Sequence, residues 1–356
     1  MKLKNLREKV SRIDGQIVNL INLRAQEVVK IGDIKQQLGR DYYHPGQEKE
    51  VYRRIQEVNR GPISSSALRA IYREIMSGCL ALEKKIVIAY LGPPATFTHL
   101  AAISRFGSSV EYLQVSSIND VFSEVETGHA DYGVVPIENS TEGAISNTLD
   151  MFMTSNAKIC AEILLRISHS LLSKEKTKND IKRIYSKAEV YGQCKIWLRA
   201  NLPNAEFVET SSTTKAAEIA AREDNSAAIA SAIASQIYGL NIIKNSIEDI
   251  HSNVTRFLVI GRIEAQKSGE DKTSIMFSTK DKVGSLHEVL GVFRRYRINL
   301  SMIESRPSRK KAWDYYFFTD CEGHVSDKRI LLAIKELEKK CDFVKILGSY
   351  PKSKEE

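Results

Sequence analysis

The chain has 356 residues, more than one core of ordinary size accommodates, so we expect two or three domains and exclude a peptide or mini-protein. With 42% apolar and 27% charged residues, the composition is that of a globular protein and excludes a disordered tail. The formal net charge of +8 divides into +7 for residues 1–85, −4 for residues 86–265 and +5 for residues 266–356.

The sequence contains no segment typical of export or of membrane insertion. No apolar run approaches the ~18 residues that span a bilayer. The start, MKLKNLREKVSRID, alternates charged and apolar residues, unlike a signal peptide. We therefore expect a cytoplasmic protein without a membrane partner. Five scattered cysteines form no CxxC pair, which argues against a disulfide framework and against a zinc site, and we expect no metal ligands.

Three helices are predicted in the first 85 residues. Apolar residues recur at spacings of three and four along residues 3–38, which is the heptad spacing of a helix packed on other helices. Two shorter helical patterns follow at residues 45–59 and 64–83. A first helix about 50 Å long cannot cover its apolar stripe within a compact monomer. We therefore expect this segment to dimerise.

The pattern changes at Lys85. Short β-branched runs alternate with helical ones up to about Gly261, which is typical of parallel α/β layers. The polar segment EAQKSGEDK is a predicted linker. The last 85 residues then show a βαββαβ order, which predicts a ferredoxin-like unit.

Two cations of the first helix lie where its stripe requires apolar residues. Arg24 follows Leu20 at the next inward position, and Lys35 lies three turns further along the same face. Buried cations are costly unless they are paired, so these positions indicate acidic partners or an anionic ligand. A polar seam of salt bridges to neighbouring helices is the alternative. Arg7 lies roughly 100° away from Arg24 around the helix. Its position alone predicts a solvated side chain.

An acidic residue at the end of the third helix is a candidate partner for these cations. Cys79 and Glu83 share the inward stripe of that helix, four residues apart. Glu83 either faces the cations of the first helix or pairs with Lys84 or Lys85 at its own helix end.

Three segments of the α/β region place polar side chains where a strand meets a turn. These are Thr96 and Thr98 in LGPPATFTHLAA, Glu138 and Asn139 in VVPIENSTEG, and Thr255 and Arg256 in HSNVTRFLVI. Ligands of open α/β sheets bind at the carboxyl ends of strands, and helix N-termini bind carboxylates. Each segment alone also fits an ordinary capped turn.

Taken together, the segments resemble the bifunctional chorismate mutase/prephenate dehydratases of phenylalanine biosynthesis along nearly the full chain. YLGPPATFTHLAA, VETGHADYGVVPIENSTEGAI, YGQC and NVTRFLVIG are similar to successive dehydratase motifs. GSLHEVLGVF and ESRP are similar to the phenylalanine-binding part of an ACT domain, and LREK, Arg24, Lys35 and the helix ending in ALE resemble the mutase.

The resemblance implies a multidomain fold. We expect an all-α three-helix mutase in a dimeric bundle over residues 1–85 and a two-lobed α/β dehydratase, similar to periplasmic binding proteins, over residues 86–265. An α+β ferredoxin-like ACT domain is expected over residues 272–352. Two activities are implied, a chorismate mutase (isomerase) and a prephenate dehydratase (carbon–oxygen lyase).

For the mutase, the resemblance implies that Arg24 holds one carboxylate of chorismate and that Arg7 reaches into the site of the partner subunit. Lys35 donates to the ether oxygen, and Glu48 contacts the substrate hydroxyl. Glu83 is the second donor to the ether oxygen, which requires a protonated carboxyl whose pKa is raised by burial. The rearrangement needs positioning and electrostatic stabilisation but no cofactor.

Three positions depart from the mutase pattern. Gln47 stands where many relatives have a substrate-binding arginine, His44 replaces a common aspartate, and Cys79 replaces a common serine; we keep His44 and Cys79 as candidate substrate contacts. Losing one charge-assisted hydrogen bond costs roughly 1.5 to 3 kcal/mol of binding. A monofunctional dehydratase with a structural or weakly active mutase domain is therefore an alternative.

For the dehydratase, the resemblance implies that Thr255 is the essential hydroxyl and donates to the leaving group of prephenate. A threonine is a weak acid, so a relay or a substrate-assisted path is expected. Further residues are expected in the cleft between the lobes: Glu138, Asn139, Ser186 and Gln193 as its catalytic lining, with Thr96, Thr98 and Arg256 in supporting roles. Pro94 and Ala95 stand where the family usually has a glycine-containing turn. Neither residue readily adopts φ > 0, so we expect this turn to differ from the usual one.

For the ACT unit, the resemblance implies that phenylalanine binds between two such domains of a dimer and inhibits the dehydratase. Feedback inhibition of this kind is a coupling free energy of ~1 to 3 kcal/mol between two sites. The residues expected around the effector are Gly284, Ser285, Leu286, Glu304, Ser305, Arg306 and Pro307.

Two functions of other classes compete with this interpretation. A non-catalytic amino-acid sensor is compatible with two α/β lobes and an ACT unit, but it does not need Thr255, Glu138, Asn139 and Gln193 together. A nucleic-acid binder is suggested by a pI near 9.0, but no recognition module is present, so we expect no nucleic-acid partner. We expect chorismate and prephenate as substrates, phenylalanine as effector, and a homodimer or higher homo-oligomer.

Overall fold

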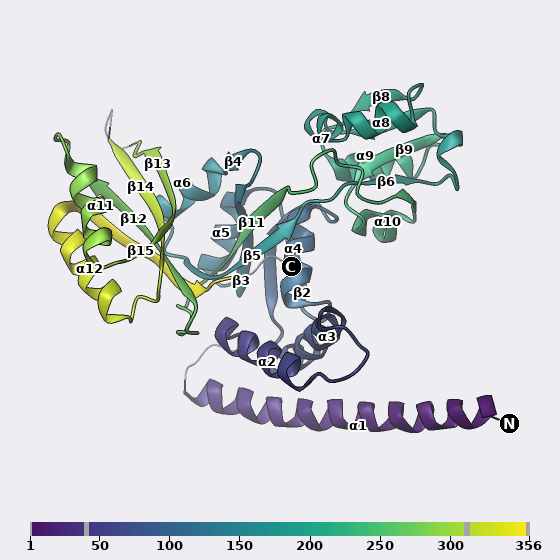
Figure 1. Ribbon diagram of the computed structural model, residues 1–356, viewed down its shortest axis with the longest axis horizontal. Helices are drawn as coiled ribbons and strands as arrows, with labels where there is room; N and C mark the ends of the chain where they lie inside the picture. Colours follow the sequence, from purple (N-terminus) through teal and green to yellow (C-terminus); the bar gives the residue numbers. More distant parts are fainter. Residues whose placement is uncertain (1, 39–42, 310–313, 354–356) are drawn as a thin grey trace.

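The computed structural model describes residues 2–38, 43–309 and 314–353. Figure 1 shows the C-terminal α+β domain at one end of the long axis and the two lobes of an α/β domain beside it. The N-terminal helices lie along one side of the first lobe. In the described part of the chain, no helix is both long and apolar enough to cross a membrane.

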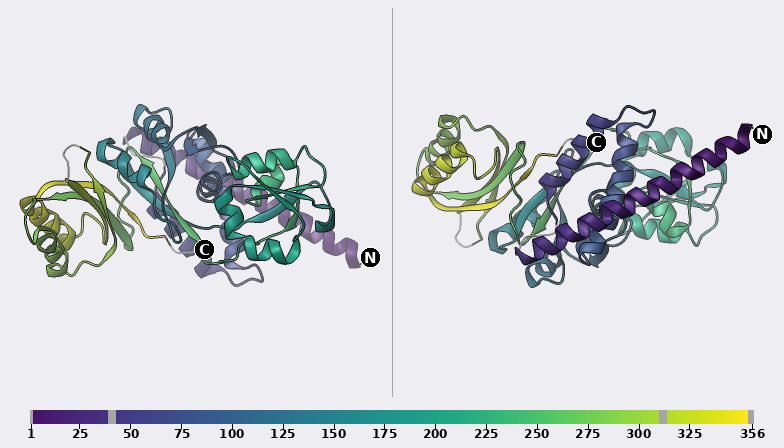
Figure 2. Two further views of the ribbon diagram at one scale, coloured as in Figure 1. Left: turned by 90° about the horizontal axis from the view of Figure 1, so that it is seen from above. Right: turned by 90° about the horizontal axis from the view of Figure 1, so that it is seen from below.

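The helical domain consists of α1 (Lys2–Gln37), α2 (Pro45–Val58) and α3 (Ser65–Glu83), so the three predicted helices are confirmed. Ser64 caps α3 by accepting a hydrogen bond from the Ala67 amide. The amino-terminal half of α1 projects beyond the other two helices (Figures 1 and 2). Its stripe is exposed to solvent at 48–63% of each side chain; the residues are Leu3, Leu6, Val10, Ile13, Ile17 and Leu20.

The first lobe is a mixed sheet in the order β2-β1-β3-β11-β5, with β4 paired to β3. Its strands are β1 (Val87–Leu91), β2 (Glu111–Val115), β3 (Tyr132–Asn139), β4 (Gly143–Ala144), β5 (Lys158–Arg166) and β11 (Val254–Gly261). Its helices are α4 (Phe97–Phe106), α5 (Ile118–Thr127) and α6 (Ser146–Thr154). The expected parallel pairing is found between β1 and its neighbours β2 and β3, whereas β11 runs antiparallel to both β3 and β5.

The second lobe is built from the segment between β5 and β11. Its sheet has the order β10-β6-β9-β7-β8. The strands are β6 (Ser170–Ser173), β7 (Arg183–Ser186), β8 (Glu206–Glu209), β9 (Ser226–Ala230) and β10 (Asn241–Lys244), and the helices are η1 (Lys178–Asp180), α7 (Ala188–Gln193), α8 (Lys195–Asn201), α9 (Thr213–Ala220) and α10 (Ile233–Tyr238). The chain therefore crosses between the lobes after β5 and returns just before β11.

The C-terminal domain has the predicted βαββαβ order. Its elements are β12 (Asp271–Thr279), α11 (Ser285–Arg295), β13 (Leu300–Pro307), β14 (Tyr315–Glu322), α12 (Lys328–Lys340) and β15 (Cys341–Pro351). The antiparallel sheet order β13-β14-β12-β15 is ferredoxin-like, so the predicted multidomain fold class is confirmed. Both helices cover one face of the sheet (Figure 1).

The other face of this sheet packs directly on the first lobe. One buried core contains Phe318, Leu347 and Tyr350 from the C-terminal domain together with Phe152 and Leu258 from the lobe. Backbone approaches backbone at Gly348, where a Cβ atom would collide with the Ile159 carbonyl of β5, so only glycine fits this position. The two domains are therefore joined through a shared apolar layer.

Candidate active sites

Four residues predicted for the mutase meet between α1 and α3. We call them the α1–α3 cluster: Arg24, Lys35, Cys79 and Glu83. The Arg24 guanidinium donates to the Cys79 sulfur at 3.0 Å. The Lys35 ammonium lies 3.8 Å from Glu83 Oε2, and the Glu83 side chain is 5% exposed. Of the two sequence-based alternatives for Glu83, the structure therefore shows the one in which it faces the cations of the first helix.

The electrostatics of the α1–α3 cluster suit an acid that holds its proton. Burial raises the pKa of Glu83, against the lowering effect of Lys35 and Arg24. Gly32 of α1 lies directly against this carboxyl, because a Cβ atom there would be 2.9 Å from Glu83 Cγ. The direction of the pKa shift is the one that a proton donor to an ether oxygen requires.

Glu48 lies in the first turn of α2. Its carboxylate forms a largely buried ion pair with Arg105 of α4, at 2.9 Å, and the same guanidinium donates to the Tyr43 hydroxyl at 2.5 Å. The contact of Glu48 with a substrate hydroxyl stays a prediction; in the structure this carboxylate is paired with an arginine of the first lobe. His44 precedes α2 at the N-cap position, where its side chain makes no capping hydrogen bond.

Arg7 lies on the projecting part of α1 with its side chain exposed. Seventeen residues separate it from Arg24, about 25 Å along a helix, so it cannot reach the α1–α3 cluster of its own chain. The exposed apolar stripe of α1 surrounds it. This geometry agrees with a residue that would act in a second copy of the chain.

The candidate dehydratase site begins at a pair of cross-strand neighbours. Asn139 of β3 lies opposite Thr255 of β11. The Asn139 amide nitrogen donates to Thr255 Oγ1 at 2.8 Å and to Asn253 Oδ1 at 2.7 Å. We call these three residues the β3–β11 cluster. Because the Thr255 oxygen accepts the Asn139 proton, its own hydroxyl proton stays available for a ligand.

A chain of hydrogen bonds runs from this cluster into the second lobe. Asn139 Oδ1 accepts from the Glu142 amide at 3.1 Å, and Glu142 Oε1 accepts from the Gln193 side chain at 3.3 Å. Gln193 Oε1 faces His169 Nε2 at 2.9 Å. Three of the predicted residues, Thr255, Asn139 and Gln193, are thus brought into one network.

Sequence reasoning missed His169 in this network. Its ring is buried and packs edge-on against Phe97 of the first lobe, with the ring centroids 5.5 Å apart. Burial lowers its pKa, so the neutral ring donates from Nε2 to Gln193. Nδ1 is buried and has no hydrogen-bond partner among residues 2–38, 43–309 and 314–353. The sequence signal that could have identified His169 is its position between β5 and β6, where the chain crosses from one lobe to the other.

Ser186 lies at the end of β7, two residues before α7 begins. Its Oγ is fully buried and has no hydrogen-bond partner within the described ranges. A buried hydroxyl without a partner costs about 1 to 3 kcal/mol, which a ligand could offset. The side chain of Ser186 is therefore not hydrogen-bonded to the β3–β11 cluster in the described part of the chain.

Thr96 and Thr98 lie at the start of α4. Thr96 caps α4, accepting from the His99 amide, and its hydroxyl donates to the Leu91 carbonyl at 3.2 Å. Its hydrogen bonds are therefore those of the capped turn that the sequence also allowed. Thr98 is buried in the first turn of α4.

Ala95 departs from the expected backbone. It adopts φ +68°, although a residue with a Cβ atom rarely does so. Its carbonyl accepts from Ser231 of the second lobe at 2.7 Å, and the Pro94 carbonyl accepts from Thr214 at 3.1 Å. These bonds from the other lobe hold the strained turn in place.

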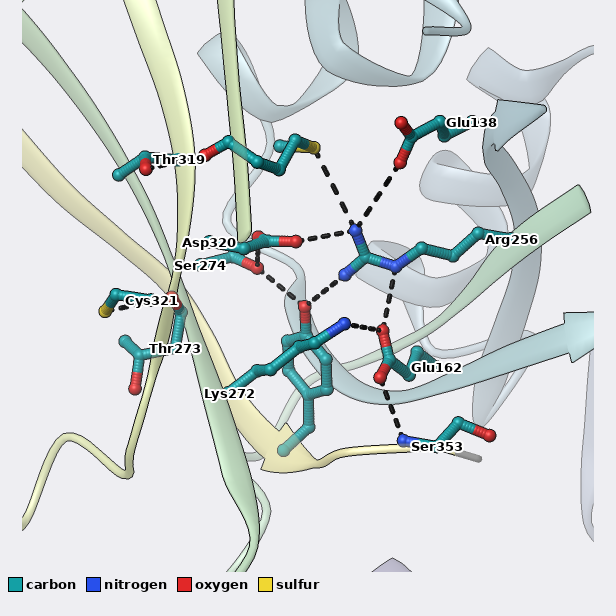
Figure 3. A network of polar contacts seen from close by, with 12 residues as sticks. Glu138, Glu162, Arg256, Lys272, Thr273, Ser274, Thr319, Asp320, Cys321 and Ser353 are labelled. Atoms are coloured by element: carbon teal, nitrogen blue, oxygen red, sulfur yellow. Dashed lines mark hydrogen bonds and ion pairs between the residues drawn. The ribbon is translucent and has the colours of Figure 1, made fainter. Parts of the chain in front are cut away.

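Glu138 and Arg256 lie on the opposite face from Asn139 and Thr255. Successive strand residues alternate in direction, and Glu138 is the cross-strand neighbour of Arg256. The Arg256 guanidinium is buried against the C-terminal domain, 2.6 Å from Asp320 and 2.8 Å from Glu162 (Figure 3). The cleft roles expected of Glu138 and Arg256 stay predictions, and strand alternation turns both side chains to the face opposite Thr255.

The expected effector residues lie at two places in the C-terminal domain. Gly284 precedes α11 with φ +85°, which favours glycine, and Ser285 Oγ is buried without a hydrogen-bond partner in the described chain. Leu286 packs on the core between sheet and helices. The remaining four lie on β13, which is an edge strand: Glu304, Ser305, Arg306 and Pro307.

One of these residues points elsewhere. Arg306 binds Asp150 of α6 in the first lobe, with Nε at 3.2 Å and Nη2 at 3.4 Å from its two oxygens. Arg309 binds the same carboxylate at 2.5 Å. The contact of Arg306 with an effector stays a prediction; in the structure its guanidinium is held at the interface of the two domains.

Comparisons with known proteins cover all three domains. Residues 88–265 match the family model of prephenate dehydratase, residues 6–84 that of chorismate mutase type II, and residues 273–339 that of the ACT domain. A bifunctional chorismate mutase/prephenate dehydratase of Aquifex aeolicus (strain VF5) is 48% identical over 356 residues, covering 99% of this chain and 98% of the relative. That of Stutzerimonas stutzeri is 45% identical over 358 residues, with the same coverage.

A solved structure extends the comparison to three dimensions. The prephenate dehydratase of Arthrobacter aurescens in complex with L-Phe superimposes with a TM-score of 0.69 at 33% identity. The match covers 75% of this chain and 90% of that chain.

Proposed function

Because the chain belongs to the family of bifunctional chorismate mutase/prephenate dehydratases, we propose that it turns chorismate into prephenate and then into phenylpyruvate in phenylalanine biosynthesis, under feedback inhibition by phenylalanine. The observation that carries the second reaction is the hydrogen bond from Asn139 to Thr255. The observation that carries the first is the meeting of the partly buried Arg24 and Lys35 with the buried Glu83 carboxyl.

In the mutase step, an ether C–O bond of chorismate breaks while a C–C bond forms, and negative charge grows on the ether oxygen. Lys35 and protonated Glu83 donate hydrogen bonds to that oxygen, and Arg24 holds a substrate carboxylate. Such donors stabilise the transition state more than the ground state, which is what accelerates a rearrangement. Arg7 of a second copy supplies the other carboxylate contact.

In the dehydratase step, the C–CO2 bond of prephenate breaks and its electron pair enters the ring as the C4 hydroxyl leaves. The Thr255 hydroxyl donates to the departing oxygen, which leaves as water after protonation. Asn139 supports this role because its amide fills an acceptor site of Thr255 Oγ1 and so directs the threonine proton outward. Gln193 binds a substrate carboxylate through its side-chain amide, and its hydrogen bonds to His169 and Glu142 support this role because they orient that amide.

Two features support a dimer with an effector site. The stripe of α1 is apolar and exposed, and such a stripe on a long helix is typical of a helix–helix interface. Strand β13, which carries Glu304 and Ser305, has a free edge in the described sheet, and an edge strand is a template for pairing. Phenylalanine would bind where two C-terminal domains meet.

The test follows both products from one substrate. Purified protein is given chorismate, and prephenate and phenylpyruvate are quantified by chromatography with and without phenylalanine. Transient prephenate followed by phenylpyruvate, slowed by phenylalanine, supports the proposal. Turnover of added prephenate without turnover of chorismate would support the structural-mutase alternative, and binding of phenylalanine without any turnover would support a sensor.

A further inference from the structure

A cluster of buried charges joins the first lobe to the C-terminal domain (Figure 3). We call it the Arg256 network: Glu162 of β5, Arg256 of β11, Lys272 and Ser274 of β12, Asp320 of β14 and Tyr350 of β15. The side chains of Arg256, Asp320 and Glu162 are 8%, 2% and 0% exposed. Its two buried carboxylates face two cations, and the half-exposed Glu138 carboxylate lies 4.0 Å from Arg256 Nη1 at the edge of the network. Removing one partner of a buried ion pair leaves an uncompensated charge, so the network is stable in an apolar layer only while it stays complete.

Each nitrogen of the Arg256 guanidinium has a close polar partner on another strand. Its Nε donates to Glu162 at 2.8 Å, its Nη1 lies 2.6 Å from Asp320 Oδ2, and its Nη2 donates to the Tyr350 hydroxyl at 2.8 Å. Glu162 also accepts from Lys272 at 3.0 Å and from the Ser353 amide at 2.9 Å. The carboxylate that binds Nε is thus itself fixed.

Two hydroxyls close the arrangement into a ring. Tyr350 and Ser274 share a hydrogen bond of 2.7 Å, and Ser274 donates to Asp320 Oδ1 at 2.5 Å. Burial, aided by Asp320, raises the pKa of Tyr350 well above its ordinary value, so its hydroxyl keeps the proton that this ring needs. A planar guanidinium held in such a ring has one allowed orientation.

Arg256 follows Thr255 in the same strand. Their side chains leave β11 on opposite faces, Thr255 toward Asn139 and Arg256 toward the C-terminal domain. Because a planar peptide joins the two residues, a shift of the β11 backbone at Arg256 is passed to the backbone of Thr255 and so to its hydroxyl. A misplacement of about 1 Å is enough to cost about a hundred-fold in rate.

The strand that carries the expected effector residues also touches this network. Met302 of β13 is the cross-strand neighbour of Asp320, and its sulfur lies 3.9 Å from Arg256 Nη1. Glu304 lies two residues further along β13. A shift of β13 against β14 therefore reaches both the carboxylate and the sulfur that face Arg256.

We propose that Arg256 is a positioning residue: it sets the place of the Thr255 hydroxyl for the dehydratase step and carries the response to phenylalanine from β13 and β14 into β11. This inference rests on the proposed function, because it concerns the regulation of that site. It assigns to Arg256 a role that involves no contact with the substrate.

The test uses the full-length protein and removes one charge from the ring. Asp320→Asn keeps the size of the side chain and weakens its hold on Nη1. We expect the kcat for prephenate to fall at least about ten-fold with KM within about two-fold, because an interaction that acts through Thr255 lowers kcat and kcat/KM together. The phenylalanine concentration for half inhibition should rise about ten-fold.

Two further readouts separate coupling from damage to the fold. Phenylalanine should still raise the melting temperature of Asp320→Asn, and the mutase rate should be unchanged. Tyr350→Phe removes a single hydroxyl from the same ring. It should lower kcat and raise the half-inhibiting phenylalanine concentration, each by less than Asp320→Asn does. If Asp320→Asn does not fold, Tyr350→Phe alone tests the proposal. Lys158→Met is the matched control, because Lys158 donates to the Ile346 carbonyl across the same interface from the far end of β5.

The proposal is overturned if folded Asp320→Asn and Tyr350→Phe keep the kcat and the half-inhibiting phenylalanine concentration of the unmodified protein. It is also overturned if Lys158→Met has the same effect as Asp320→Asn, since any interface change would then suffice. Failure of the unmodified protein to form phenylpyruvate or to bind phenylalanine would instead refute the proposed function.

Discussion

Asn139 and Thr255 are cross-strand neighbours, and the amide of Asn139 donates a 2.8 Å hydrogen bond to the Thr255 hydroxyl oxygen. This polarity determines what Thr255 can do. A threonine oxygen that accepts from an amide directs its own proton away from that partner. The pair therefore presents a hydroxyl donor rather than a hydroxyl acceptor.

Reversing this polarity should stop the dehydratase. In Asn139→Asp a carboxylate faces Thr255 Oγ1, so the hydroxyl donates to it and its proton is withdrawn from the leaving group. We expect a loss of about 10²- to 10³-fold in kcat for prephenate, the scale of one removed transition-state donor. Steady-state assays of phenylpyruvate formation measure this. Full activity of the Asn139→Asp variant would show that the polarity of the pair is irrelevant.

The mutase rate should depend on the protonation of Glu83. Burial raises the pKa of this carboxyl, and only its protonated form donates to an ether oxygen. The protonated fraction falls as the pH rises through that raised pKa, so kcat/KM for chorismate should decline up to about ten-fold per pH unit above it.

Glu83→Gln is the matched control for this pH dependence. A glutamine amide donates at every pH, so the rate of this variant should stay flat from about pH 5 to 9. A declining profile that persists unchanged in Glu83→Gln would assign the titration to another group.

The ion pair of Glu48 and Arg105 should contribute to stability. Arg105→Met leaves the Glu48 carboxylate buried without its partner, which costs about 3 to 5 kcal/mol for a pair of this kind. Urea unfolding followed by helical circular dichroism should show the loss. Arg53→Met, in the exposed pairs with Glu50 and Glu57, should leave the urea midpoint unchanged.

This comparison also tests what Glu48 does. If its carboxylate serves chorismate instead of Arg105, Arg105→Met will unfold at the midpoint of the unmodified protein. Glu48→Gln will then lower the mutase rate without loss of stability.

The stripe of α1 should be needed for the mutase but not for the dehydratase. Ile17→Glu places a charge in the proposed helix interface, so Arg7 of the second copy no longer reaches the α1–α3 cluster. We expect loss of mutase activity with unchanged conversion of added prephenate. Gln16→Glu, exposed on the same helix but off the stripe, should be neutral. Equal mutase rates in the two variants would contradict a site shared between subunits.

Local patterns predicted much of this fold. Heptad spacing located α1, and the βαββαβ order of the last segment predicted the ferredoxin-like sheet. Periodicity in the sequence reports which face of an element is buried. It cannot report that β11 returns antiparallel between β3 and β5, because that depends on how the second lobe is inserted.

For the candidate sites too, local patterns could be predicted from the sequence and contacts between domains could not. Helix periodicity put Arg24, Lys35 and Glu83 on inward stripes and left open whether they pair with one another, and the structure shows Lys35 beside Glu83. The partners of Glu48 and Arg306 were not predicted, because Arg105 and Asp150 come from other domains, 57 and 156 residues away along the chain. The sequence analysis expected Arg256 beside Thr255 in the cleft, although strand alternation puts neighbours on opposite faces, and only the packing of the C-terminal domain shows what Arg256 contacts.

The most direct test of the account follows Thr255→Ala and Thr255→Ser with chorismate as the only substrate. Product analysis by chromatography gives prephenate and phenylpyruvate in one experiment. Thr255→Ala should accumulate prephenate at the mutase rate of the unmodified protein and form no phenylpyruvate above the spontaneous rate, while Thr255→Ser, which keeps the hydroxyl, should retain part of the second step. Phenylpyruvate formation by Thr255→Ala at the unmodified rate would contradict the account.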